Sequence, residues 1–207
     1  MESQGFLVLP GFLDPKKLKE KCEIYRIRTE SIFNGPGRND HKRRQTNLPE
    51  SMVKEMKDQI QSIPFLSDSH RIEDFVLLRS LPGCARQAAH TDYIPDLSLL
   101  RCEPDKLPYL FLFAIEDNTK LVVWPGSHKV VQGRGRSLDP IQPKTITIQA
   151  GDALVFRPDL VHAGAEYETE NLRIHCYIDS TAIKRQPNRT WIIGKHAEEL
   201  VRNKIVE

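Results

Sequence analysis

The chain has 207 residues, of which 39% are hydrophobic and 28% are charged, and its 30 Lys and Arg nearly balance 28 Asp and Glu for a net charge of +2. This length allows one sizeable core and is short for two full domains. A dedicated nucleic-acid-binding protein has a strong excess of basic residues, and this chain does not, so its charge argues against that class. We therefore expect a single domain over residues 1–207, with a helical region at about 1–72, a jelly-roll core at about 73–180 and an extension at about 181–207.

The cysteines and the apolar runs indicate the compartment. No two cysteines form a C-x-x-C pair, so we expect reduced thiols at Cys22, Cys84, Cys102 and Cys176. The opening MESQGFLVLPGFLDP lacks the basic and apolar regions of a signal peptide, and no run approaches the length of about 18 apolar residues that a membrane span needs. We expect a cytoplasmic protein that does not contact the membrane.

The opening of the chain predicts a short strand followed by a helix. The run GFLVLPGFL predicts a strand that ends at its Pro-Gly pair. Asp14 is placed to cap the next helix, and Pro15 suits its first position because that position needs no backbone N–H donor. We expect this helix to run to about Phe33, with one side formed by Leu18, Cys22, Tyr25 and Thr29.

The next stretch, NGPGRNDHKRRQTN at residues 34–47, is rich in Gly, Asn and charge and predicts a loop. Its basic run HKRRQ suits either a solvated surface or contacts to phosphates or an acidic substrate, and we expect the solvated surface. A second helix is predicted from Pro49 to Ile63. Its buried side is expected to contain Met52, Met56, Gln59 or Ile60, and Ile63.

Short β-like runs separated by Gly, Pro and Asp follow from residue 73 onward. They are DFVLLRSL, RQAAHTDY, YLFLFAIE, KLVVWP, KTITIQ, ALVFRP, HAGAEY and LRIHCYID. So many short runs favour a sandwich or jelly roll over alternating strands and helices. The predicted fold class is mainly β with flanking helices: a double-stranded β-helix, or cupin-like jelly roll, with N-terminal helices packed on one face. The tail KHAEELVRNKIVE predicts a last outer helix.

The tripeptide HTD contains two candidate metal ligands, His90 and Asp92. A strand projects residues i and i+2 from the same face, so both side chains can reach one ion. A jelly roll brings its second and seventh strands together at one mouth of the barrel. We therefore expect His162 to lie beside His90 and Asp92. Two neutral imidazoles and a carboxylate with open coordination positions form the facial triad of non-haem Fe(II) oxygenases. Arg173, in the final strand, is placed to grip a dicarboxylate by a two-point contact.

These residues also have structural interpretations. His90 and Asp92 could form a hydrogen-bonded pair at the surface, without a metal. Arg173 could form an ion pair with a structural carboxylate such as Asp179 or Glu166. Either arrangement would leave the chain without the site described above.

Two other histidines compete for the third metal position. His128 also follows a turn, but no strand with a suitably placed arginine comes after it, because Arg134 and Arg136 lie in the Gly-rich run VQGRGRS. His196 begins the sequence HAE, which mimics an H-x-E pair, but no His and Arg follow it. We expect His196 on a surface helix and favour His162 as the ligand.

Four features in order resemble the Fe(II)/2-oxoglutarate-dependent dioxygenases, most closely their phytanoyl-CoA dioxygenase-like branch. The run GFLVLPGFLDPKKL is similar to the branch's opening strand and helix, and HTD is similar to its H-x-D pair. LVVWPGSHK is similar to its P-G-S-H turn, and GDALVFRPDLVHAG followed by NLR is similar to its distal histidine and 2-oxoglutarate arginine. Together these features span about residues 5–178.

The resemblance implies that His90, Asp92 and His162 hold Fe(II) and that Arg173 holds the far carboxylate of 2-oxoglutarate. It implies a dioxygenase that consumes O₂, releases succinate and CO₂, and is stimulated by ascorbate. The carboxylate of Asp92 favours hydroxylation over halogenation, because the family's halogenases have a small residue there. We expect a small-molecule or natural-product substrate. The alternatives are a hydroxylase or demethylase acting on protein or nucleic acid, and a non-catalytic metal-binding jelly roll.

The substrate pocket is expected between residues 34–48, 93–107 and 131–143, the least patterned parts of the chain. An anionic or polar substrate is favoured by the basic side chains there or nearby, which are Arg101, Arg134, Arg136 and Lys144. The chain is short compared with typical members of the branch, which argues against a bulky acyl-CoA. The expected pocket-lining residues are Tyr93, His175, Tyr177, Trp124 and Arg134.

Overall fold

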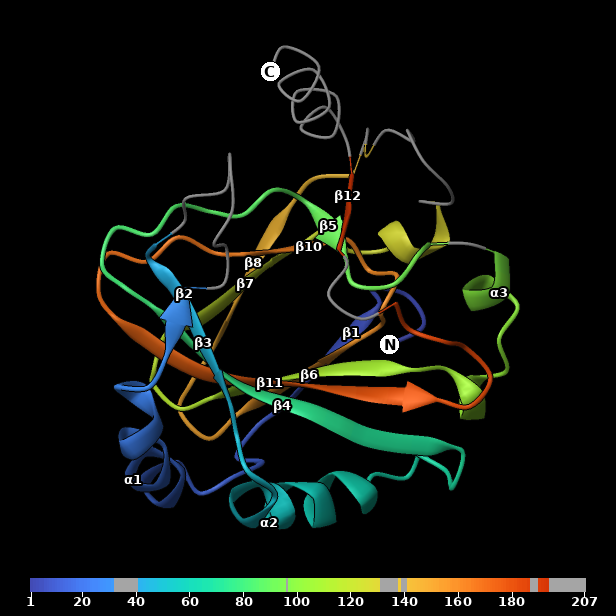
Figure 1. Ribbon diagram of the computed structural model, residues 1–207. Coiled ribbons are helices and arrows are strands. Elements are labelled where there is room, and N and C mark those ends of the chain that lie inside the picture. Colours follow the sequence, from blue (N-terminus) through green and yellow to red (C-terminus); the bar gives the residue numbers. More distant parts are fainter. Residues whose placement is uncertain (32–40, 96, 131–137, 139–140, 187–189, 194–207) are drawn as a thin grey trace.

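The computed structural model describes residues 1–31, 41–95, 97–130, 138, 141–186 and 190–193 (Figure 1). Its strands form two antiparallel sheets. In spatial order, the larger sheet contains β1 (Phe6–Leu9), β9 (Ala153–Phe156), β6 (Tyr109–Ala114), β11 (Asn171–Ser180), β4 (His70–Ser80), β3 (Arg43–Asn47) and β2 (Glu30–Ser31). The smaller sheet contains β12 (Trp191–Ile192), β5 (His90–Thr91), β10 (His162–Gly164), β7 (Thr119–Val123) and β8 (Lys144–Ile148). From β4 to β11 the chain passes back and forth between the two sheets, which confirms the predicted jelly roll.

The sequence of β6, YLFLFA, explains how the layers are held together. Alternate residues of a strand point to opposite faces. Leu110 and Leu112 pack between the two sheets, whereas Phe111 and Phe113 lie in the cluster that also contains the buried side chains of the helices. All six residues of β6 are buried, and each large apolar side chain stabilises the fold by about 1.5–3 kcal/mol. The larger sheet therefore needs helices on its outer face.

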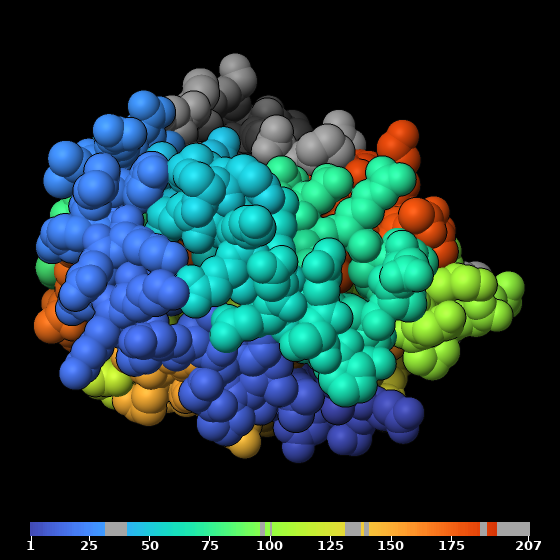
Figure 2. Space-filling model, turned by 90° about the horizontal axis from the view of Figure 1, so that it is seen from below, coloured from blue at the N-terminus to red at the C-terminus, as the bar shows by residue number. Residues whose placement is uncertain are grey.

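Two helices cover that face, α1 (Pro15–Arg26) and α2 (Glu50–Gln61), and they are seen from outside in Figure 2. The Asp14 carboxylate caps α1 as predicted, because Oδ1 accepts hydrogen bonds from the backbone N–H groups of Lys16 and Lys17 at 3.0 and 3.3 Å. α2 lies within the predicted range and buries Met52, Val53, Met56 and Ile60. Single turns at α3 (Leu97–Leu100), η1 (Pro104–Lys106) and η2 (Ser127–Lys129) lie in the connections.

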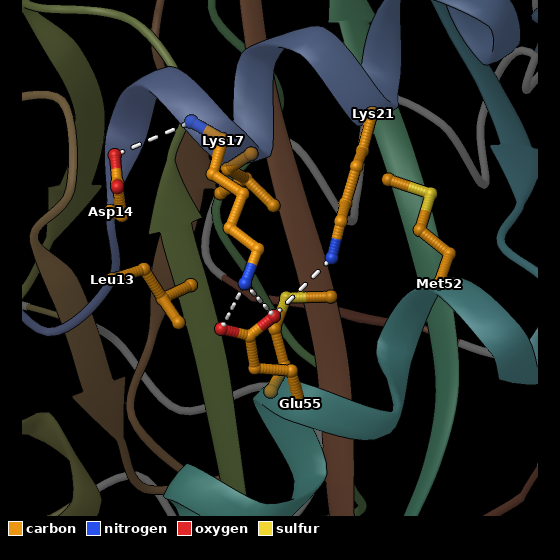
Figure 3. A pocket seen from close by; sticks show the side chains of 8 residues that line it. Leu13, Asp14, Lys17, Lys21, Met52 and Glu55 are labelled. Carbon is orange, nitrogen blue, oxygen red and sulfur yellow. Dashed lines mark hydrogen bonds and ion pairs between the residues drawn. The ribbon is translucent and has the colours of Figure 1, made fainter.

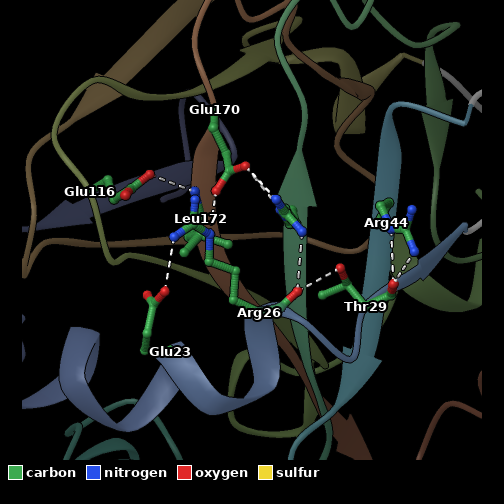
Figure 4. A network of polar contacts seen from close by, with 8 residues as sticks. Glu23, Arg26, Thr29, Arg44, Glu116, Glu170 and Leu172 are labelled. Carbon is green, nitrogen blue, oxygen red and sulfur yellow. Dashed lines mark hydrogen bonds and ion pairs between the residues drawn. The ribbon is translucent and has the colours of Figure 1, made fainter.

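The first helix is shorter than predicted, since α1 ends at Arg26 and the chain enters β2 soon afterwards. The Thr29 hydroxyl donates to the Arg26 carbonyl at 2.9 Å, which satisfies a carbonyl at the helix end. Figure 4 shows how this end is anchored: Glu170 accepts from Arg26 Nε at 2.5 Å and from Arg79 Nη2 at 2.7 Å. One carboxylate thus ties α1 to β4 and to the start of β11, and the prediction of a helix to Phe33 was wrong.

The predicted loop at residues 34–47 is also corrected, because its last five residues form β3 and pair with β4 along their whole length. Arg43 is 1% exposed and is not on the expected solvated surface. Its Nη2 donates to the carbonyl oxygens of Ala85, Gly164 and Ala165 at 2.6, 3.2 and 2.7 Å. Backbone carbonyls from three other positions thus accept hydrogen bonds from one nitrogen of this buried guanidinium. The sequence did not indicate this burial, because an inward-facing charged residue does not fit an alternation of apolar and polar residues.

The chain returns to the smaller sheet after β11. β12 pairs with β5, with Trp191 opposite Thr91 and Ile192 opposite His90. The stretch expected to be an outer extension therefore adds a strand beside the HTD sequence. The predicted last helix, at residues 195–207, lies outside the described residues. Among the described helices, none combines the length and the apolar character needed to cross a bilayer.

Candidate metal centre

Three predicted ligands meet at one mouth of the jelly roll. His90 begins β5 and His162 begins β10, and these two residues lie opposite each other in the antiparallel pair. Asp92 follows β5, and its Oδ1 lies 3.8 Å from Nε2 of each histidine. The three ligand atoms lie within 4.8 Å of one another. The structure therefore brings His90, Asp92 and His162 close enough to bind one metal ion.

Both imidazoles are oriented by the backbone. His90 Nδ1 lies 2.7 Å from the Ala88 carbonyl and His162 Nδ1 lies 3.0 Å from the Leu160 carbonyl. A carbonyl only accepts hydrogen bonds, so each Nδ1 carries the proton and donates it. The lone pair then lies on Nε2, which is the atom that faces Asp92 in both histidines. Such hydrogen bonds fix the tautomer and the ring orientation of metal-binding histidines.

The surroundings of His162 and Asp92 favour the protonation states that bind metals. It lowers the pKa of His162 to about 4, so the imidazole is neutral at physiological pH. Burial alone would raise the pKa of Asp92, but the surrounding His162, His90 and His175 lower it below its ordinary value, and the carboxylate is ionised. Two neutral imidazoles and one carboxylate are the donor set of non-haem Fe(II) oxygenases. The residues present thus fit a bound ferrous ion.

Arg173 lies on β11 and is 5% exposed. Its Nη1 donates to Ser80 Oγ at 2.9 Å and to Asn171 Oδ1 at 3.4 Å, and the guanidinium lies 5.4 Å from the centre of the Tyr167 ring. Within the described residues no ion pair of Arg173 with a carboxylate is found, and Asp179 pairs with another arginine. Burial lowers the pKa of Arg173. A buried cation held only by neutral groups is well placed to receive an anion.

Two of the predicted pocket residues contact the triad directly. His175 Nε2 lies 3.9 Å from Asp92 Oδ2, and the Tyr177 hydroxyl donates to the same oxygen at 3.3 Å. Burial lowers the pKa of His175 to about 4 and raises that of Tyr177, so both side chains are neutral. Tyr93 is buried and its hydroxyl donates to Asp179. The structure thus places His175 and Tyr177 beside the metal ligands and Tyr93 one contact further away.

The other two predicted pocket residues are Trp124 and Arg134. Trp124 packs in a cluster with Val161 and Ala163, which flank His162 in sequence and so point to the opposite face of β10. Trp124 therefore lies behind the triad. Arg134 falls in residues 131–137, outside the described part of the chain.

Several residues near the site were missed by sequence reasoning. Asn171 lies two residues before Arg173, and alternate residues of a strand share a face, so the sequence could have indicated it. Ser80 approaches Arg173 only through the pairing of β4 with β11. Arg185, described below, lies after the last long strand in a segment with no apolar pattern, and nothing in the sequence marks it.

His128, the competing histidine, is not part of the metal group. It lies in η2, is 4% exposed, and its Nε2 is 3.3 Å from the Glu2 carbonyl. Its neighbour Ser127 accepts a hydrogen bond from the backbone N–H of Val161 at 2.9 Å. The P-G-S-H turn thus supports the strand that carries His162. His196 lies outside the described residues.

A separate surface hollow lies between α1 and α2 (Figure 3). Exposed Lys17 and Lys21 bridge to the Glu55 carboxylate across it, at 2.8 and 3.3 Å. Asp14 also lines the hollow, so two carboxylates balance the two lysines, and the apolar remainder is formed by Leu13, Leu18, Met52 and Met56. The hollow holds no group of metal ligands and is not the candidate site.

Comparison with known proteins decides the family. The sequence model described as phytanoyl-CoA dioxygenase (PhyH) matches residues 1–175. The chain belongs to the phytanoyl-CoA dioxygenase family. The match covers the HTD sequence, His162 and Arg173, and it confirms the resemblance drawn from the four sequence features. No curated protein matches the chain.

Solved structures with the same fold share little sequence with this phytanoyl-CoA dioxygenase family member. The non-haem α-ketoglutarate-dependent epimerase SnoN from nogalamycin biosynthesis has a TM-score of 0.64 at 16% identity, with 94% of this chain and 92% of that chain covered. HygX from Streptomyces hygroscopicus, with nickel and 2-oxoglutarate bound, has a TM-score of 0.64 at 17% identity over 89% and 86%. The carbocyclase SnoK, also from nogalamycin biosynthesis, has a TM-score of 0.62 at 16% identity over 97% and 87%.

These likenesses support the jelly-roll assignment, and at such low identity they extend to the fold alone. The enzyme class follows from the family. A chain of the phytanoyl-CoA dioxygenase family that carries this His-Asp-His group is a 2-oxoglutarate-dependent non-haem iron oxygenase.

Proposed function

We propose that His90, Asp92 and His162 bind Fe(II), that Arg173 binds the far carboxylate of 2-oxoglutarate, and that the enzyme hydroxylates a small-molecule or natural-product substrate with release of succinate and CO₂. The observation that carries this proposal is the convergence of two backbone-oriented Nε2 atoms and one ionised carboxylate within 4.8 Å. When bound, iron and 2-oxoglutarate would activate O₂, which is the oxidant for both 2-oxoglutarate and the substrate. The residues of the chain hold, orient and enclose them.

Arg173 supports the role of 2-oxoglutarate. Its guanidinium is buried, and Ser80 and Asn171 engage only one of its nitrogens in the hydrogen bonds described above. A planar guanidinium matches a carboxylate in a two-point contact, and the hydroxyl of Ser80 can add a further donor. Arg173 and His175 are two residues apart on β11, so their side chains project from the same face of the strand. One strand therefore directs side chains toward both the metal group and the proposed position of 2-oxoglutarate.

The proposal of a small-molecule substrate is supported by the solved structures that share this fold. The solved relatives include an epimerase, a carbocyclase and a HygX complex with hygromycin B. Their range of reactions means that hydroxylation here rests on the carboxylate of Asp92 and on the sequence resemblance. The nucleic-acid alternative loses support, because Arg43 of the basic run is buried and both Arg43 and Arg44 donate hydrogen bonds to backbone carbonyls.

The test is anaerobic addition of Fe(II) and 2-oxoglutarate to the purified protein, followed by air. A weak visible charge-transfer band, and then slow succinate formation without substrate, is the expected result. The rate of succinate release can then be used to screen substrates, since a true substrate accelerates it. A folded protein that gives neither band nor succinate would contradict the proposal and favour a non-catalytic jelly roll.

A further inference from the structure

The two oxygens of the Asp92 carboxylate have different neighbours. Oδ1 faces the metal position, 3.8 Å from Nε2 of both His90 and His162. Oδ2 is turned away and accepts the hydrogen bond from the Tyr177 hydroxyl at 3.3 Å. His175 Nε2 lies 3.9 Å from the same oxygen. The carboxylate is thus arranged to offer one oxygen to a metal and the other to a phenol.

Tyr177 is itself held in place from both sides. The Arg185 guanidinium lies over its ring at 3.9 Å from the centroid, and the His175 ring meets it nearly edge-on at 4.8 Å and 81°. A cation over an aromatic face is attracted to the ring, more strongly where water is excluded, and the Arg185 side chain is only 12% exposed. The cation also draws electron density from the phenol, which makes its hydroxyl a better donor to Asp92.

Arg185 is fixed by two carboxylates. Its Nε and Nη2 contact Asp179 Oδ1 and Oδ2, both at 3.0 Å, and Nη2 also donates to Asp74. Tyr93 donates its hydroxyl to the same Asp179. Asp74 of β4 and Asp179 of β11 therefore converge on this one guanidinium, and Tyr93 is connected to it through Asp179. A planar, two-point contact of this kind sets the orientation of the arginine as well as its position.

A distortion of β4 brings Asp74 into this arrangement. Tyr177 pairs with Glu73 and His175 pairs with Val76, so β4 has one residue more than β11 between these pairs. Asp74 lies in this bulge with φ of +51°, a backbone conformation that is uncommon for residues other than glycine. Bulges and strained residues occur often beside functional sites, where they redirect a side chain. Here the redirected carboxylate binds Arg185.

From these contacts we infer that Tyr177 and Arg185 are positioning residues that hold Asp92 as a one-oxygen ligand of iron. This inference rests on the proposed function. If Asp92 bound through both oxygens, it would take a coordination position that 2-oxoglutarate or O₂ requires, and the Tyr177 hydrogen bond opposes that rotation. Tyr177, Asp179 and Arg185 all lie beyond residue 175, where the family match ends. The arrangement is therefore a feature of this chain that the family assignment does not supply.

The test is Fe(II) retention by Tyr177→Phe, which keeps the ring and removes the hydroxyl. The variant and the wild-type protein are loaded with Fe(II) without oxygen, and the transfer of iron to a coloured chelator is followed. Tyr109→Phe is the matched control, because it also removes a phenol hydroxyl that donates to one oxygen in a part-buried hydrogen bond, here the Pro104 carbonyl at 3.2 Å. We expect Tyr177→Phe to weaken iron binding about 10- to 100-fold, which is typical for partners of metal ligands, and Tyr109→Phe to match the wild type.

A second variant separates positioning from simple structural support. Arg185→Leu keeps the phenol and removes the cation and both carboxylate contacts, and it is expected to weaken iron binding in the same direction. Each variant's visible band with 2-oxoglutarate is recorded beside its thermal unfolding without metal. The expected result is a shifted band in both variants and an unchanged band in Tyr109→Phe.

The outcomes distinguish this inference from the proposed function. Wild-type protein that fails to bind Fe(II) overturns both. Wild-type protein that binds Fe(II), together with a folded Tyr177→Phe variant that retains iron equally well and shows the same band, overturns the positioning role alone.

Discussion

His162 lies directly opposite His90 in the pairing of β10 with β5, with ring centroids 4.5 Å apart. Both strands are short, and each is held by a further partner: β10 pairs with β7 over three residues, and β5 pairs with β12. The smaller sheet therefore supports two of the three candidate ligands from both sides. Phe156 of the larger sheet also meets the His162 ring edge-on at 5.0 Å, so both sheets restrict that imidazole.

Removal of any one triad side chain is expected to abolish tight iron binding. Asp92→Ala takes away the only charged donor, and His162→Ala takes away one of two oriented imidazoles. Anaerobic Fe(II) titration measures the stoichiometry, which should fall from one ion per chain to none. His128→Ala is the control, since this buried histidine lies outside the group and should leave one ion bound. A folded Asp92→Ala protein that binds and turns over as before would refute the assignment.

Arg173→Ala should separate cosubstrate binding from metal binding. Iron stoichiometry should not change, because Arg173 contacts none of the three ligands in the hydrogen bonds described. The affinity for 2-oxoglutarate should fall by roughly 30-fold or more, equivalent to about 2 kcal/mol or more for loss of a buried charge partner. Titration of the visible band with 2-oxoglutarate measures this. Arg173→Lys should bind with intermediate affinity, since it keeps the charge and loses the planar contact; wild-type affinity in Arg173→Ala would exclude the proposed role.

The metal-free protein is expected to lose stability as the pH falls from 7 to 5. Burial lowers the pKa of His162 and His175 to about 4 from an ordinary value of 6.5. Between these values the unfolded chain binds protons that the folded chain does not, so the free energy of unfolding decreases as the pH falls. At pH 5 the loss is at most about 2 kcal/mol for each histidine. The lowered pKa of Asp92 contributes outside this range, because its stabilising effect is lost only when the pH falls below the ordinary value of 3.8.

Urea denaturation with a chelator at pH 7, 6 and 5 measures this dependence. His175→Gln should flatten the curve, because one of the two buried imidazoles is removed. His41→Gln, at an exposed position outside the metal group, should leave the curve unchanged. Stability that is constant from pH 7 to pH 5 would be inconsistent with neutral, buried imidazoles.

Arg43→Met is expected to destabilise the fold by about 2–5 kcal/mol, because three backbone carbonyls lose the nitrogen that now satisfies them. Methionine keeps much of the apolar stem, so the measurement isolates the hydrogen bonds. Arg86→Met, at an exposed position, should change stability by only about 0.5 kcal/mol or less. Denaturant unfolding of both variants tests this, and equal stabilities would restore the interpretation of the basic run as solvated surface.

The sequence by itself determined the fold class and the candidate ligands, because both depend on local order. Short apolar runs between turn residues indicate strands, and the H-x-D spacing places His90 and Asp92 together whatever surrounds them. Asp14 with Pro15 marked the start of α1 for the same reason, since capping involves only neighbours in the chain.

Only the tertiary structure decided the roles of residues whose partners are distant in sequence. Arg43 looked like part of a solvated loop, and it is buried because carbonyls more than a hundred residues away accept its hydrogen bonds. Trp124 looked like a pocket residue, and packing against Val161 and Ala163 places it on the far face of β10. No sequence pattern marked Arg185, and its contacts with Tyr177 and Asp179 are seen only in the folded chain. Long-range contacts leave no periodic trace in a single sequence, so the surroundings of the metal ligands, unlike the ligands themselves, become visible only in three dimensions.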